Sequence, residues 1–130
     1  MAKESILIVD DNEMNLKLLR WLLEKNGYAV HTAGDAKTAR ESVRAVHPCL
    51  VLMDIQLPDI DGLQLTREFK ADPELRDIPV VAVTSYAMKG DRQKSIEAGC
   101  DGYITKPIDT RQFPLEIEKY LRRPGGSSSK

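Results

Sequence analysis

Residues Cys49–Gly62 read CLVLMDIQLPDIDG, and this segment determines how the rest of the chain is interpreted. Leu50–Met53 is an apolar run without polar alternation, which is typical of a strand buried on both faces of a parallel sheet. Asp54 follows the run directly, and Pro58 and Gly62 mark the loop beyond it. Because ligands of open α/β sheets bind at the carboxyl ends of the strands, Asp54 is a candidate reactive group.

Two further apolar runs have the same character and also end in polar residues. Ser5–Val9 precedes an acidic pair, and Val80–Val83 precedes a threonine and a serine. Tyr28–Ala33 and Gly102–Thr105 complete the set of expected strands. Helical segments lie between and after these strands, so the chain predicts five strands alternating with five helices in a doubly wound α/β sandwich.

The expected helices have recognisable boundaries. Asn12 is a candidate N-cap of the first helix, and Gly27 is expected to end it as C-cap. That helix carries leucines at helical spacing, namely Leu16, Leu18, Leu19, Leu22 and Leu23. Asp35 is a candidate N-cap of the second helix, which should end before Pro48. Pro114 predicts that the last helix begins late or is distorted, because proline beyond the first turn removes a backbone donor.

The composition limits the classes of function. The 130 residues fit one domain, which we expect to span residues 1–123, with a flexible tail at 124–130. A net charge of -1 gives no sign of a nucleic-acid partner or an acidic membrane surface. The chain has neither an apolar run of about 20 residues nor a signal peptide, so we expect a cytoplasmic protein. The spacing of Cys49 and Cys100 favours reduced, packed thiols over a disulfide or a metal site.

Polar side chains collect at the carboxyl ends of the expected strands. They are Asp10, Asp11, Asp54, Thr84 and Lys106. Three converging carboxylates would repel one another, so the arrangement calls for a cation, and oxygen ligands suit Mg²⁺. A lysine and a hydroxyl would then hold an anion beside the metal, and a phosphoryl group fits that description best.

Several motifs in this order identify a family resemblance. They are Asp10–Asp11, Met53–Gly62, Thr84 and Tyr103–Pro107. Together they resemble the receiver domain of two-component response regulators, over about residues 5–121 in one register. The segments Asp10–Asn15 and Ala87–Asp91 look most like stand-alone receivers of the DivK type and like receivers of hybrid kinases.

The resemblance implies a five-stranded parallel sheet in the order 2-1-3-4-5, as in CheY-like proteins. It makes Asp54 the phosphoacceptor and Lys106 the cation that pairs with the phosphoryl group. Thr84 becomes the switch hydroxyl and Tyr103 the switch aromatic. The implied ligands of Mg²⁺ are Asp10, Asp11, Asp54 and the backbone carbonyl of Gln56.

Two further positions, each directly after one of these residues, bear on the resemblance. Pro107 matches the proline whose preceding peptide bond is usually cis in such domains. Ser85 is a departure, since an alanine usually follows the switch threonine, and it bears on how the phosphoryl group is accommodated.

The implied partner is a histidine kinase or a histidine phosphotransfer protein that donates the phosphoryl group. Phosphorylation would draw Thr84 toward the new oxygens and let Tyr103 turn inward. The surface of the fourth helix, fifth strand and fifth helix would then pass the signal to a separate protein. The domain would act as a monomer or as a phosphorylation-dependent dimer, and as a switch rather than an enzyme.

Two other functions share parts of the pattern. A magnesium-dependent aspartyl-phosphate phosphatase of the haloacid dehalogenase type would use a D-x-D motif after the first strand, which Asp10–Asn12 matches poorly. A flavodoxin-like FMN carrier would share the fold but needs a phosphate-binding loop after the first strand that is absent from this sequence.

Other polar and aromatic residues have simpler interpretations. We expect Asp59 and Asp61 to be turn residues rather than metal ligands. His31 and His47 lie away from the ends of the strands that carry the acids, and we expect them to be structural. Trp21 lies off the main apolar stripe of its helix, so partial exposure with a docking role and ordinary packing both remain open.

Overall fold

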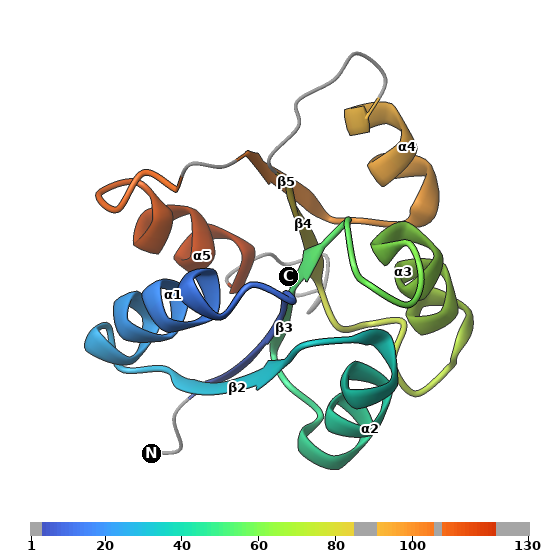
Figure 1. Ribbon diagram of the computed structural model, residues 1–130, viewed down its shortest axis with the longest axis horizontal. Coiled ribbons are helices and arrows are strands. Elements are labelled where there is room, and N and C mark those ends of the chain that lie inside the picture. Colours follow the sequence, from blue (N-terminus) through green and yellow to red (C-terminus); the bar gives the residue numbers. More distant parts are fainter. Residues whose placement is uncertain (1–3, 85–90, 106–107, 122–130) are drawn as a thin grey trace, which may run out of the picture.

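The computed structural model describes residues 4–84, 91–105 and 108–121. Five strands alternate with five helices in these ranges, as the sequence predicts (Figure 1). In chain order they are β1 (Ser5–Val9), α1 (Glu13–Lys25), β2 (Ala29–Ala33), α2 (Ala36–Val46), β3 (Leu50–Asp54), α3 (Gly62–Ala71), β4 (Val80–Thr84), α4 (Asp91–Ala98), β5 (Gly102–Thr105) and α5 (Phe113–Leu121). None of the described helices has the length and apolar character needed to cross a membrane.

The strands form one parallel sheet in the order β2-β1-β3-β4-β5, which confirms the expected topology. Val9 in β1 pairs with Met53 in β3, and Asp54 pairs with Val83 in β4. Thr84 pairs with Thr105 at the end of β5. This register brings the carboxyl ends of β1, β3 and β4 to the same edge of the sheet.

Helices cover both faces of the sheet, with α1 and α5 on one side and α2, α3 and α4 on the other (Figure 1). The alternation within β3 explains its continuous apolar sequence. Leu50 and Leu52 pack into the core beneath α1 and α5, whereas Val51 and Met53 pack into the core beneath α2 and α3. All four side chains are at most 1% exposed, so neither face of β3 has room for a polar residue.

The capping residues act as the sequence indicates, with small shifts at the C-terminal ends. The side chain of Asn12 accepts a hydrogen bond from the Asn15 backbone at the start of α1. Asn26 is the C-cap of α1, and Gly27 follows it with a φ of 91°. Pro114 is the second residue of α5, which begins at Phe113. The late start of α5 places this proline in the first turn, where a missing N–H costs little.

Two expectations about packing are wrong. Leu18 is 38% exposed, because α1 buries only the narrower stripe that includes Leu19 and Leu23. Cys49 is exposed, whereas Cys100 is partly buried as expected, and both thiols are free. Trp21 is 57% exposed, with the ammonium group of Lys25 at 4.8 Å from the ring centre.

Candidate functional site

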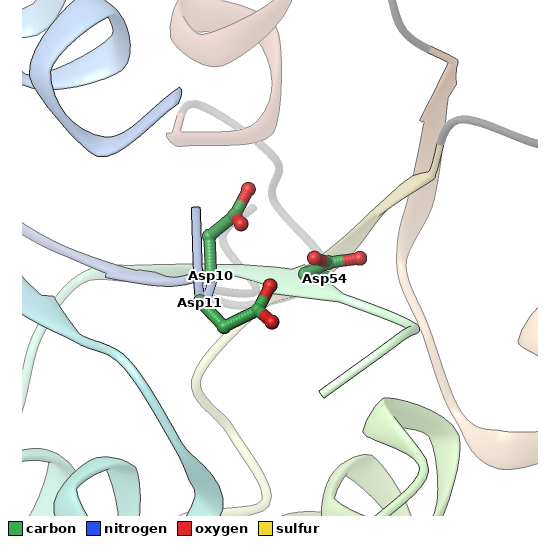
Figure 2. Close-up of side chains that lie close together, drawn as sticks. All are labelled: Asp10, Asp11 and Asp54. Carbon is green, nitrogen blue, oxygen red and sulfur yellow. The ribbon is translucent and has the colours of Figure 1, made fainter. Parts of the chain in front are cut away.

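Three carboxylates lie together at the carboxyl edge of the sheet. Asp10 and Asp11 follow β1, and Asp54 ends the neighbouring strand β3 (Figure 2). One carboxylate oxygen from each of the three lies within 4.8 Å of those of the other two. Asp10 is 2% exposed and Asp54 is 6% exposed, while Asp11 is exposed. The sequence placed Asp54 just after its strand, whereas the structure makes it the last paired residue.

Local hydrogen bonds fix the position of Asp10. Its backbone N–H donates to the carbonyl of Ala33 at the end of β2, at 3.0 Å. The carboxylate accepts from the Asn12 backbone at 2.9 Å and from the Asn15 side-chain amide at 3.4 Å. The beginning of α1 therefore orients this acid, and sequence reasoning missed the part played by Asn15. Asn15 lies in the first turn of α1, and this position was the feature of the sequence that could have indicated a contact with Asp10.

The loop after β3 is held close to Asp54. The carboxylate of Asp54 accepts a hydrogen bond from the Gln56 backbone N–H at 3.0 Å. Gln56 also pairs with Asp61 in an isolated antiparallel bridge, and the Gly62 N–H donates to the Ile55 carbonyl at 2.7 Å. The end of the loop therefore lies beside its beginning, next to the end of β3.

Gly62 permits this close return. A Cβ atom at this position would lie 2.8 Å from the Cα atom of Ile55 and would also meet the carbonyl oxygen of Asp54. These neighbours are backbone atoms, which cannot swing aside as a flexible side chain can. The first residue of α3 therefore packs directly against the end of β3.

The remaining candidate residues lie on neighbouring strands or outside the described residues. Thr84 ends β4, next to β3, and is 2% exposed. Tyr103 lies in β5 and is partly buried. Ser85, Lys106 and Pro107 fall outside the described residues, as does the expected tail at 124–130.

Asp59 and Asp61 have roles other than metal binding. Within the described part of the chain, the group of acids close enough to hold an ion contains only Asp10, Asp11 and Asp54. Asp61 is the N-cap of α3, where it accepts from the Leu63 N–H at 2.8 Å. Asp59 binds the start of α2, a tertiary contact that the sequence did not predict.

The donor set fits a hard divalent cation. All three side chains offer oxygen, and two of them are buried, where negative charges brought close together are costly. No nitrogen or sulfur ligand belongs to this group among the described residues, which distinguishes it from typical zinc sites. Binding a divalent cation would offset most of the negative charge that these three carboxylates bring together.

Comparison with known proteins agrees with this geometry. The sequence profile of the response regulator receiver domain matches residues 6–118. The polar-differentiation response regulator DivK of Brucella ovis is 48% identical over 118 residues, which cover 91% of this chain and 96% of that protein. DivK of Brucella anthropi is 47% identical over the same coverage.

Solved structures show the same architecture. A CheY-like receiver domain protein from Methanospirillum hungatei superposes with a TM-score of 0.87 and 31% identity, covering 98% of this chain and 100% of its own. The receiver domain of a sensor histidine kinase from Pseudomonas aeruginosa PAO1 gives 0.86 and 31%, covering 94% and 100%. That structure has a magnesium ion coordinated in its active-site cleft.

Proposed function

Because the chain belongs to the response regulator receiver family, we propose that Asp54 is its phosphoacceptor and that Asp10, Asp11 and Asp54 hold Mg²⁺ beside it. The protein is a DivK-type response regulator, a signalling switch of two-component systems rather than an enzyme. The family match therefore argues against both the aspartyl-phosphate phosphatase and the flavin carrier. The grouping of three carboxylates within 4.8 Å is the observation that carries the assignment of the site.

The metal site would be completed by the backbone of the β3–α3 loop. The Gln56 carbonyl is the proposed fourth protein ligand, and the hydrogen bond from its own N–H to Asp54 holds this residue beside the acceptor. The magnesium ion coordinated in the related Pseudomonas receiver supports the choice of metal. When bound, the ion would neutralise negative charge on the incoming phosphoryl group.

Asp54 would act as the nucleophile. One carboxylate oxygen attacks the phosphorus atom of a phosphohistidine, the new P–O bond forms as the P–N bond breaks, and the histidine imidazole leaves with the electron pair. Such a transfer needs mainly position and charge neutralisation. Asp54 meets the first need, since it is fixed at the end of a strand that is buried on both faces.

The proposed switch residues belong to β4 and β5 and to the segments that follow these strands. Thr84 would donate a hydrogen bond to the phosphoryl oxygens, and Lys106 would pair with their charge. Ser85 follows the switch hydroxyl, and Pro107 would set the path of the chain after the lysine. Thr84 is suitably placed, because it ends the strand next to β3 and is buried at the same edge.

The surface formed by α4, β5 and α5 is the proposed output face for a downstream protein. Tyr103 lines a pocket of about 180 Å³ with Ile96 and Tyr120, and it also lines a second pocket of about 300 Å³ with Glu116. This space would let the ring change position when Thr84 moves. Ile96 is 56% exposed, so the face also offers apolar contact area.

Receiver domains work with histidine kinases, and we propose such a kinase or a histidine phosphotransfer protein as the donor. The remaining parts of the proposal are a receiver domain over residues 1–123, a flexible tail at 124–130 and a cytoplasmic location. Nucleic acids and membranes are not proposed partners, which agrees with the net charge of -1. The working state would be a monomer or a phosphorylation-dependent dimer.

Intact mass spectrometry tests the acceptor directly. The wild-type protein is incubated with acetyl phosphate, with and without Mg²⁺, beside Asp54→Asn and the control Asp35→Asn, whose acid lies at the start of α2. We expect one adduct of about 80 Da that needs Mg²⁺, persists in Asp35→Asn and is absent from Asp54→Asn. Labelling of Asp54→Asn at Asp10, or no labelling of the folded wild type, would contradict the proposal.

A further inference from the structure

The loop between β3 and α3, residues 55–61, is attached to the start of α2 through Asp59, which lies between the loop's two ends. The carboxylate of Asp59 accepts from the Ala36 backbone N–H with both oxygens at 3.0 Å and from the Lys37 N–H at 3.3 Å. It also accepts from the Ile60 N–H at 3.1 Å within its own loop. The hydrogen bonds from the backbone, above all from Ala36, lower the pKa of Asp59, so the carboxylate is ionised at neutral pH.

This contact is distinct from the helix's own capping. Asp35 already caps α2 from within the helix's sequence, accepting from the Thr38 N–H at 2.8 Å. Asp59 takes the N–H groups of the first two helical residues, which have no partner inside the helix. The helix start therefore binds two carboxylates, one local and one from the loop after β3. A negative charge there is also favoured by the helix dipole.

The attachment connects the two halves of the acidic site. Ala36 lies three residues after Ala33, whose carbonyl accepts the hydrogen bond from the Asp10 N–H. Asp59 lies in the loop that begins at Asp54 and contains Gln56. Two hydrogen-bonded contacts, joined by the chain segment from Ala33 to Ala36, thus connect Asp10 to the loop that follows Asp54.

We propose that Asp59 is a positioning residue that anchors the 55–61 loop to α2 and so holds Asp54 and Gln56 in place relative to Asp10 and Asp11. This inference rests on the proposed metal and phosphoacceptor site. Without the anchor, the loop is fixed near its two ends by Gln56 and Gly62, and its middle has no bond to α2. Residues that orient metal ligands commonly affect affinity although they never touch the ion.

The test compares carboxylates at the same helix start. Asp59→Ala removes the anchor, Asp59→Asn removes the charge but keeps an oxygen that can accept from Ala36, and Asp35→Ala removes the local cap. Thermal unfolding measures stability, isothermal titration calorimetry with MgCl₂ measures metal affinity, and mass spectrometry with acetyl phosphate measures the labelling rate. Both alanine variants should lower the melting temperature, since each leaves N–H groups of α2 without an acceptor.

Positioning predicts a specific pattern of metal affinity. Asp59→Ala should bind Mg²⁺ about 10-fold more weakly and label more slowly, Asp59→Asn should recover most of the loss, and Asp35→Ala should match the wild type. The inference is overturned if Asp59→Ala keeps wild-type affinity and labelling despite its lower melting temperature. It is equally overturned if Asp59→Asn is as weak as Asp59→Ala, since charge alone would then account for the effect. A wild-type protein that binds no Mg²⁺ would instead refute the proposed site itself.

Discussion

Replacing Gly62 by alanine tests how closely the loop returns to the end of β3. Gly62 is the first residue of α3 and is absent from the residues with positive φ, so its backbone conformation suits alanine. Helix propensity alone would make Gly62→Ala stabilising by up to about 1 kcal/mol. The structure predicts the opposite sign, because the new Cβ would meet the carbonyl oxygen of Asp54 and the Cα atom of Ile55.

The magnitude follows from what must move. Backbone atoms have to separate, and overpacking of this kind costs about 1–3 kcal/mol. The 2.7 Å hydrogen bond from Gly62 to Ile55 would be stretched or lost, at about 0.5–1.5 kcal/mol. After the gain in helix propensity is subtracted, we expect a net destabilisation of roughly 1–3 kcal/mol.

Urea unfolding followed by far-ultraviolet circular dichroism measures this free energy. The midpoint for Gly62→Ala should fall by about 1 M if the loss is near 2 kcal/mol. Gly34→Ala is the matched control, because a Cβ at Gly34 has its nearest neighbour at 4.0 Å, the carbonyl oxygen of Asp10. That variant should be at least as stable as the wild type. A Gly62→Ala protein with wild-type or higher stability would refute the steric reasoning.

Two further predictions concern charge and thiol chemistry. The ion pair with Arg40 lowers the pKa of Glu68 below its ordinary value of 4.5, so the pair should stabilise the wild type over Glu68→Gln at pH 7 and lose that advantage as the pH falls below 4.5. Urea unfolding in low salt should show that the free energy of unfolding of Glu68→Gln is lower than that of the wild type by about 0.2–1 kcal/mol at neutral pH. A difference that stays constant down to pH 3 would contradict this role of the ion pair. Burial raises the pKa of Cys100 to about 11, while Cys49 is exposed. A thiol reagent at pH 8 should therefore react in one fast phase, that of Cys49. A fast phase that survives in Cys49→Ser would show that Cys100 is accessible.

Most of the fold could be predicted because three of its strands are continuous apolar runs in the sequence. The apolar runs at β1, β3 and β4 are buried on both faces, so their sequences exclude polar residues. Each run ends in a polar residue, and parallel strands deliver such residues to one edge. The grouping of Asp10, Asp11 and Asp54 followed from this rule and from the family resemblance, and the structure confirms it.

The errors and omissions arose where sequence spacing does not determine tertiary contact. Leu18 fits a helical stripe as well as its neighbours do, but only the packing angle of α1 decides which flank of the stripe meets the sheet. The contact of Asp59 with α2 was missed because its partner, Ala36, lies 23 residues earlier in the sequence. The sequence indicates that Gly62 marks the end of a loop. It does not indicate which backbone atoms Gly62 contacts, because these depend on the path of the whole loop.

The pairing of β1 with β3 has a consequence for the fidelity of signalling. Asp10 and Asp54 are separated in the sequence by β2 and α2, and they are neighbours in space because β3 pairs with β1. An unfolded chain carries all three acids but does not hold them together. If the group accepts phosphate as proposed, phosphorylation is restricted to molecules in which β1 and β3 are paired. Immature copies would then neither consume phosphoryl groups nor send a false signal.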